Sequence, residues 1–246
     1  MFILLKRDWY GFRKHFFTYL VIWSVIPLLI HILLVIPLSQ LIVVPVRYLN
    51  WAAAGIWTVS VAMASFFEVS DRIRKLKYET NQINIILHSP VSNMELLIAL
   101  LLRGCAFGII QFIFSIIITC TLNNEYLGLW NFSLIFIQII SIILFFSTLG
   151  IFIGLLISNR ALFINIYVVF IMIVTLGMGT FIPIEHYPQS YSQVVNNIPL
   201  MLIVQNMQSV IINQNIGWIS LFSNLVCTLA LFLISLIISN KIFRKI

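Results

Sequence analysis

The stretch FSLIFIQIISIILFFSTLGIFIGLLI (residues 132–157) determines the class of fold, because no charged residue interrupts it. A helix needs about 20 predominantly apolar residues to cross the roughly 30 Å hydrocarbon core of a bilayer, and this run is longer. The strands of a membrane barrel would instead show short segments in which apolar and polar residues alternate. The stretch therefore predicts a membrane-spanning helix.

Five further runs of the same kind lie before and after it. The sequence predicts an all-α integral membrane protein with six transmembrane helices, built as a single transmembrane domain over residues 1–246. The predicted spans are residues 16–38, 51–68, 95–119, 132–157, 161–181 and 218–239.

The composition of the 246-residue chain agrees with this interpretation. Hydrophobic residues make up 61% of the chain and charged residues 9%, and the mean hydropathy is +1.09. Soluble domains carry about 45–50% apolar and about 25% charged residues. A soluble enzyme, a disordered chain and a nucleic-acid-binding domain are therefore excluded, and membrane lipids are the expected surroundings.

The distribution of basic residues predicts the orientation in the membrane. Lys and Arg near helix ends are retained on the cytoplasmic side. With the N-terminus inside, all but one of the 14 Lys and Arg residues fall on that side, and Arg47 is the exception. We therefore expect N- and C-termini that are both cytoplasmic. The net charge of +7 follows from this rule and from contact with anionic lipid.

The segment MFILLKRDWYGFRKHFF (residues 1–17) leads into the first span. Phe2, Leu5, Trp9 and Phe12 can share one face of a helix with basic residues at its edge, which suits a helix lying in the membrane interface. The alternative is that the segment is only the basic flank of the first span. It lacks the small-residue cleavage site of a signal peptide.

The cytoplasmic segment 69–94 carries the most informative pattern in the chain. Its basic residues are expected to hold it at the lipid surface, and residues 79–87 can form a short amphipathic helix. Pro90 would end that helix, and Ser92 with Glu95 three residues later forms a capping box for the next one. A short helix between two spans is suited to receive a push from a partner protein. The alternative is a plain interfacial loop.

No catalytic, cofactor-binding or metal site is predicted. The chain has no G-x-x-x-x-G-K-[ST] or G-x-G-x-x-G motif, so another chain must supply any energy that it uses. The four histidines fall on different segments, and His31 alone lies inside a span. Asp71 is the one Asp beyond the N-terminal arm, which excludes an aspartyl dyad. The three cysteines are interpreted as small buried hydrophobes.

Several residues inside the spans have more than one possible role. Two G-x-x-x-G pairs, at residues 104–108 and 150–154, allow close helix packing within the subunit or across a dimer. Arg103 would extend to the cytoplasmic side or pair with Glu95 or Glu68. Gln111 and Gln138 would hydrogen-bond between helices or line a path. Four tryptophans are interpreted as anchors at the membrane interface, namely Trp51, Trp57, Trp130 and Trp218.

The sequence SPVS (residues 89–92), followed by MELL (residues 94–97), resembles the "LL.SPVS..EL" signature of ABC type-2 transporter permeases, the membrane subunits of bacterial ABC exporters. The resemblance extends over the chain and includes the basic N-terminal arm and six spans with both ends inside. In the external connection, FIP (181–183), YP (187–188) and NIPL (197–200) resemble the proline-containing stretch that precedes the last span in that family.

The resemblance implies a transport subunit without a catalytic site of its own. A second permease, identical or related, and two copies of an ABC ATPase would be its partners, and the ATPase would bind the ATP and Mg. The N-terminal arm would be an elbow helix and residues 79–87 the coupling helix, which sits in a cleft of the ATPase. An external re-entrant segment would precede the last span. The complex would export an amphiphilic drug, lipid, peptide or glycolipid across the bacterial inner membrane.

The resemblance also implies two groups of functional residues. In three positions the chain departs from the family: Asn84 stands where a Glu is usual, and Gln205 and Gln208 stand where an acid and an Arg are frequent. The implied ATPase-coupling helix and loop contain Glu79, Gln82, Ile83, Ile86, Leu87, Ser89, Pro90, Ser92 and Glu95. The implied external re-entrant segment contains Pro183, Pro188, Asn197, Pro199, Gln205 and Gln208.

Two other classes of function stay open on the residues alone. A non-transporting immunity or scaffold protein of a membrane complex would tolerate substitutions in the SPVS loop. A membrane enzyme acting on lipids would be active without nucleotide and would need polar residues gathered at one depth.

Overall fold

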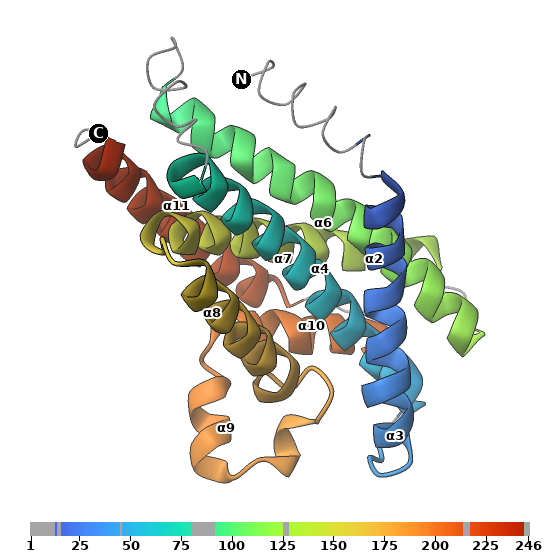
Figure 1. The fold of residues 1–246 in the computed structure, drawn as a ribbon. Coiled ribbons are helices and arrows are strands. Elements are labelled where there is room, and N and C mark those ends of the chain that lie inside the picture. The colour runs from blue at the N-terminus through green and yellow to red at the C-terminus, as the bar shows by residue number, and fades with distance from the viewer. Residues whose placement is uncertain are drawn as a thin grey trace.

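The computed structural model describes residues 13, 16–44, 46–79, 92–124, 128–213 and 217–243. Within these ranges every regular element is a helix, and Figure 1 shows the long helices packed into one bundle. Six of the described helices are long and apolar enough to cross a membrane. The prediction of an all-helical, multi-pass membrane protein is therefore confirmed.

The first span consists of α2 (Phe16–Ile30), the π-helix η1 (His31–Val35) and α3 (Ile36–Ser39), which follow one another without a break. The second span consists of α4 (Tyr48–Arg74) and the π-helix η2 (Lys75–Glu79). The third span is α6 (Asn93–Asn123). The last three consist of α7 (Leu129–Leu156), α8 (Arg160–Met172) with the π-helix η3 (Ile173–Gly177), and α11 (Trp218–Phe243). Between η3 and α11 lie the 3-10 helix η4 (Ile184–His186), α9 (Gln189–Val195) and α10 (Pro199–Asn213).

The described spans lie within four residues of the predicted ranges at every end except one, the end of the second span. The second was predicted to end at residue 68, whereas α4 and η2 continue to Glu79. The extension is helical because Asp71 pairs with Arg74 and Lys75, three and four residues later on the same face. The fifth was predicted to reach residue 181, whereas its helix ends at Gly177.

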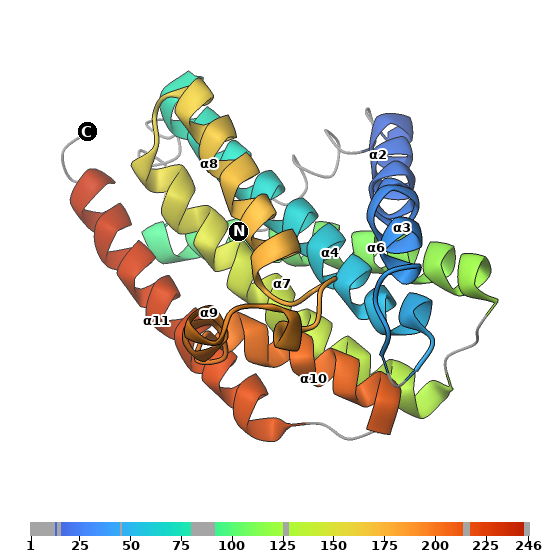
Figure 2. The same cartoon turned by 90° about the horizontal axis from the view of Figure 1, so that it is seen from below.

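The α4 helix lies at the centre of the bundle. Within its most apolar window 78% of the residues are buried inside the protein, compared with 22% for the first span and 17% for both α8 and α11. Figure 2 shows α4 crossing the middle of the bundle, with α2 on one side and α11 on the other. Small residues at positions 52–55, 60, 62, 64 and 65 allow its neighbours to approach closely. The outer helices have the large apolar side chains that lipid requires.

Both G-x-x-x-G pairs are contacts within the subunit. Gly104 and Gly108 of α6 lie against α7, and Gly150 and Gly154 of α7 lie against α4. A Cβ atom on Gly150 would stand 2.8 Å from the carbonyl oxygen of Phe66, where no side chain fits. Packing of α6 on α7 and of α7 on α4 therefore uses these glycines.

Two of the four tryptophans are not at the lipid interface. Trp57 is 2% exposed and its indole N–H donates to Thr119 Oγ1 at 2.8 Å, so it joins α4 to α6 inside the bundle. Trp51 is also buried. The interface interpretation is wrong for these two because α4 is surrounded by protein. Trp130 and Trp218 are exposed at the starts of α7 and α11, as an interfacial anchor requires.

Polar contacts between helix termini define the two ends of the bundle. At one end, which we call the charged end, Asn93 at the start of α6 donates to Asn240 of α11 at 2.7 Å. At the opposite end, which we call the Arg47 end, Arg47 donates to the carbonyl oxygen of Asn123 at 3.2 Å. Consequently α6 runs opposite to α4, and α7 and α11 both run towards the charged end.

The chain bends sharply between α9 and α10. The axes of the two helices differ by 94° across a short break, and together they carry enough apolar length for a broken span or a re-entrant loop. Figure 1 shows α9 set apart from the spanning helices, whereas α10 lies across them. Pro199 is the first residue of α10, a position that favours proline because the missing N–H has no partner there in any helix.

Candidate functional site

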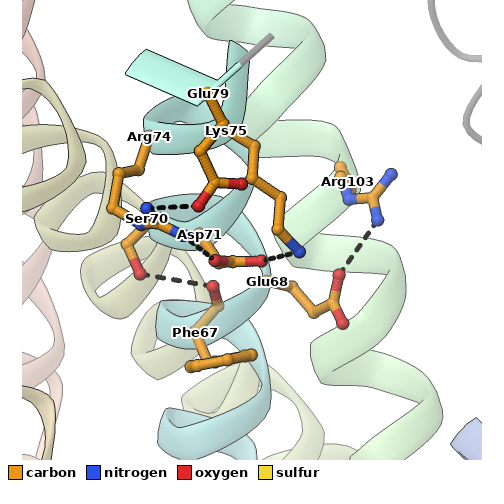
Figure 3. Close-up of polar contacts among 8 residues, drawn as sticks. All are labelled: Phe67, Glu68, Ser70, Asp71, Arg74, Lys75, Glu79 and Arg103. Carbon is orange, nitrogen blue, oxygen red and sulfur yellow. Dashed lines mark hydrogen bonds and ion pairs between the residues drawn. The ribbon is translucent and has the colours of Figure 1, made fainter. Parts of the chain in front are cut away.

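A cluster of paired charges lies at the charged end of α4 (Figure 3). Arg74 is its centre and is only 2% exposed. Its guanidinium donates to Asp71 Oδ1 at 2.9 Å and to Glu79 Oε1 at 2.8 Å, and it lies 5.6 Å from the centroid of the Phe163 ring. The two carboxylates and the ring compensate for the loss of water around a buried cation.

Two further ion pairs surround Arg74. Lys75 Nζ lies 2.6 Å from the other oxygen of Asp71, on the exposed side of the helix. Arg103 of α6 donates to Glu68 Oε2 of α4 at 3.0 Å, and both side chains are mostly buried. Of the pairings predicted for Arg103, the one with Glu68 is therefore confirmed. This pair joins α4 to α6 just inside the charged end.

The cluster fixes the chain immediately before residues 80–91. Glu79 is the last residue of η2 and is held by Arg74 five residues earlier. Lys77 Nζ and the Tyr78 hydroxyl donate to the carbonyl oxygen of Leu155, at 3.0 and 3.3 Å. That oxygen belongs to the last turn of α7, where carbonyl groups lack helical partners and cations are favoured.

The chain immediately after residues 80–91 is fixed as well. Ser92 Oγ accepts from the Glu95 N–H at 3.2 Å, and the Ser92 N–H donates to Glu95 Oε2 at 3.0 Å. The predicted capping box is therefore confirmed. The next residue, Asn93, is held by Asn240. Both flanks of residues 80–91 are thus anchored on the bundle.

The residues between these flanks lie outside the described residues. They include most of the predicted coupling positions, namely Gln82, Ile83, Ile86, Leu87, Ser89 and Pro90. The proposed elbow helix in the N-terminal arm also lies outside the described residues. Glu79, Ser92 and Glu95 are described, and each contributes to an anchored flank.

The second predicted site lies at the Arg47 end, between η3 and α11. Each of its three prolines stands at the start of a helix: Pro183 before η4, Pro188 before α9, and Pro199 as the first residue of α10. The prolines therefore set the positions at which this connection turns.

An unwound segment, residues 178–183, is enclosed by the bundle and forms the inner part of this connection. Gly179 has a φ of +63°, a left-handed conformation that glycine adopts without strain. The carbonyl oxygen of Gly179 accepts from Gln208 Nε2 of α10 at 3.0 Å, and that of Phe181 accepts from the Tyr48 hydroxyl of α4 at 2.6 Å. The Thr180 hydroxyl donates back to the carbonyl of Val174 at 2.9 Å. Non-helical backbone is thus satisfied by side chains, as membrane depth requires.

Two stacked tyrosines hold α9 against the end of η3. The Tyr187 hydroxyl donates to the carbonyl of Leu176, and the Tyr191 hydroxyl donates to the carbonyl of Gly177 at 2.8 Å. Partial burial, with Tyr191 beside it, raises the pKa of the Tyr187 phenol, so this donor keeps its proton at neutral pH. Val195 is the one buried residue of α9. Tyr191 of α9 and Tyr187 just before it therefore attach this helix to the end of η3.

Replacing both tyrosines with phenylalanine is expected to release α9 without unfolding the bundle. Each hydrogen bond contributes about 1 kcal/mol, so amide exchange in residues 189–195 should accelerate roughly tenfold or more. Hydrogen–deuterium exchange with mass spectrometry measures this. Tyr167→Phe is the matched control, because no described residue accepts a hydrogen bond from that hydroxyl. Unchanged exchange in the double variant would show that other contacts hold α9.

The three polar residues of this predicted site bond within the connection or to the adjoining unwound segment. Gln208 holds the unwound segment, Gln205 Nε2 donates to Asn196 Oδ1 at 3.1 Å, and Asn197 Nδ2 donates to the carbonyl of Gln193 at 2.8 Å. Gln205 and Gln208 thus have structural partners in the described part of the chain.

The sequence interpretation missed the buried arginine and the tyrosines. Basic residues 72–77 were expected to lie at the lipid surface, but Arg74 points into the bundle. The spacing of Asp71 to Arg74 and Lys75 was the available signal, because such pairs neutralise one another on a helix. No local pattern indicates that a tyrosine will bond to a carbonyl in a different element. Among the described residues, no group of three His, Cys, Asp or Glu could hold a metal ion.

Comparison with known proteins adds no assignment: no family model matches the chain, and no curated protein matches it.

Proposed function

We propose that this chain is the membrane subunit of an ATP-driven exporter of the ABC type-2 class. The observation that carries the proposal is the position of the SPVS segment. It lies in the connection between two anchored helix ends: the Arg74–Glu79 pair holds the end of η2, and the capping box of Ser92, the last residue of SPVS, holds the start of α6. A helix mounted in this way moves together with α4 and α6 when a partner pushes it.

The arrangement of the spans supports the same proposal. Six of the described helices are long and apolar enough to cross a membrane, and a bent helix pair precedes the last of them. In the proposal the charged end is cytoplasmic, since the Lys and Arg residues gather there. The pair α9–α10 is then the external re-entrant segment, with polar side chains that satisfy its backbone. Both termini are cytoplasmic, and the N-terminal arm lies in the interface as an elbow helix.

The proposed complex contains two permease chains and two ATPase subunits in a bacterial inner membrane. ATP and Mg bind to the ATPase, and closure of the ATPases moves the coupling helices. The exported substrate is amphiphilic. Beside the coupling segment, Arg74 pairs with Asp71 and Glu79, and Lys75 pairs with Asp71. In the proposal these paired charges transmit force rather than bind substrate.

The proposal is tested by purifying the tagged chain from its own cells in mild detergent and assaying what co-purifies. A stoichiometric ATPase subunit is expected. Ile83→Asp with Ile86→Asp should abolish its retention, because burying an unpaired carboxylate in an apolar interface costs several kcal/mol. Asn81→Asp with Asn84→Asp is the matched control, since it places the same two charges on the predicted polar side.

A chain that purifies alone and shows no nucleotide dependence would contradict the proposal. It would favour the scaffold or immunity alternative if substitutions in the SPVS loop have no effect on the cell. Activity on lipid without nucleotide would favour the enzyme alternative.

A further inference from the structure

A polar side chain, Asn165, lies on the surface of the spanning helix α8. It is the sixth of the 18 residues of its span, about 7.5 Å along the helix axis from the first residue, Arg160. The side chain is exposed, and no described residue shares a hydrogen bond with its amide. An amide in contact with lipid tails is unfavourable, and polar residues inside a membrane mostly face protein or water. Asn165 therefore indicates a surface that something other than lipid covers.

The inner face of α8 is already occupied by α4. Phe163 is 1% exposed, and the rings of Tyr167 and Phe170 stack on the ring of Phe66 of α4, with centroids 5.8 and 5.3 Å apart. Successive residues of a helix are about 100° apart, so Asn165 lies on the side of α8 opposite to these three aromatic residues. Figure 1 shows α8 at the periphery of the bundle, which leaves that opposite side free.

This opposite side, which we call the outer face of α8, has the spacing of a helix–helix contact. Leu162, Asn165, Val169 and Met172 follow one another at intervals of three, four and three residues, and all four are exposed. Two helices that pack side by side use this heptad spacing, and a single Asn among the apolar residues fixes their register and their number. The outer face is therefore suited to another helix.

The chemistry of the amide selects the partner. An Asn side chain carries two N–H donors and one carbonyl acceptor, so it is complementary to a second Asn. Two copies of Asn165 that face each other across a twofold axis can each donate to the carbonyl oxygen of the other. Copies of one chain insert in the same orientation, so the two asparagines lie at the same depth in the membrane. A second copy of this chain therefore satisfies the exposed amide.

We propose that two copies of this chain associate through the outer faces of α8, with their Asn165 side chains hydrogen-bonded to each other. The inference rests on the pairing of two permease chains in the proposed function. It adds that the two chains are identical and that α8 is the helix through which they meet. The association needs no ATPase, so it can be tested on the chain alone.

The association is measured by single-molecule photobleaching in liposomes that contain only the purified, dye-labelled chain, over a range of protein-to-lipid ratios. The parent chain is expected to form dimers. Asn165→Leu should weaken the dimer about tenfold, because the two hydrogen bonds are lost and lipid accommodates leucine well. Asn165→Gln is the matched control, since it keeps the amide, and its dimer should be close to that of the parent chain.

Two results of this measurement would overturn the proposal. A parent chain that is monomeric at every ratio would mean that lipid, or a different protein, covers the outer face. A dimer that Asn165→Leu leaves at full strength would mean that the copies meet elsewhere.

Cysteine cross-linking tests the face itself. The three native cysteines are replaced by alanine, and either Val169→Cys or Ile164→Cys is added. Both positions are exposed, but Val169 lies on the outer face, whereas Ile164 lies about 100° away from Asn165 around the helix. Oxidation in liposomes should link Val169→Cys into dimers and leave Ile164→Cys mostly monomeric. Equal yields at the two positions would contradict the proposed contact.

The inference and the proposed exporter fail in different ways. A dimer that depends on Asn165, in a chain that retains no ATPase, would support the inference and contradict the exporter. An ATPase that co-purifies with a chain whose dimer is unaffected by Asn165→Leu would support the exporter and overturn the inference.

Discussion

Arg74→Met is expected to lower the free energy of unfolding by about 2 kcal/mol, which is less than the roughly 3–5 kcal/mol for breaking a fully buried ion pair, because Glu79 is 39% exposed and Asp71 keeps its pair with Lys75. Methionine fills much of the same volume, so the loss comes from charge and hydrogen bonding. Asp71 and Glu79 would lose the donors at 2.9 and 2.8 Å, and the Phe163 ring would lose its cation. Unfolding of the purified protein by sodium dodecyl sulfate in mixed micelles measures the change.

Lys75→Met is the matched control for this prediction. Lys75 pairs with the same carboxylate, but its side chain is 47% exposed. An exposed pair contributes about 0–1 kcal/mol, so the control should be close to the parent protein. Equal losses of stability in Arg74→Met and Lys75→Met would show that burial does not make the ion pairs of Arg74 stronger than the exposed pair of Lys75. In the proposed exporter, Arg74→Met should also reduce ATPase retention, since Glu79 would no longer anchor the coupling segment.

Gly55→Ala is expected to destabilise the protein by about 3 kcal/mol, the upper part of the usual range for overpacking. A Cβ atom on Gly55 would collide with the carbonyl oxygen of Thr180 and would stand 2.9 Å from the Phe181 ring. The obstructing oxygen is backbone, and hydrogen bonds from Tyr48 and Gln208 hold the segment around it. Neither α4 nor the segment 178–183 can move aside without losing those hydrogen bonds.

Gly128→Ser is the control for the glycine substitution. Nothing lies within 4 Å of a Cβ atom at Gly128, and serine is well suited to this N-cap position of α7. Its stability should equal or slightly exceed that of the parent protein. Thermal unfolding in detergent compares the two variants. A Gly55→Ala protein as stable as the parent would mean that the segment 178–183 is not packed against α4.

The spanning helices could be predicted from the sequence because each is a long apolar run, and the cost of burying charge in lipid is independent of the partners of the helix. The capping box at Ser92 was likewise predictable, since both of its hydrogen bonds are formed within four consecutive residues. The pairing of Arg103 was among the predicted options because an arginine inside a span requires a carboxylate. In each case the interactions that determine the structure lie close together in the sequence or follow from the surrounding lipid.

Tertiary structure alone decided which surfaces face protein. Trp57 and Trp130 look alike in the sequence, yet one joins α4 to α6 and the other is exposed, because only the packing of α4 at the centre separates them. The glycines were recognised as sites of close approach, but whether they served a dimer or the subunit depended on the neighbouring helix. The unwound segment at Gly179 forms where Tyr48 and Gln208 can reach its carbonyls. Such long-range hydrogen bonds, between residues far apart in the chain, leave no periodic pattern in a sequence.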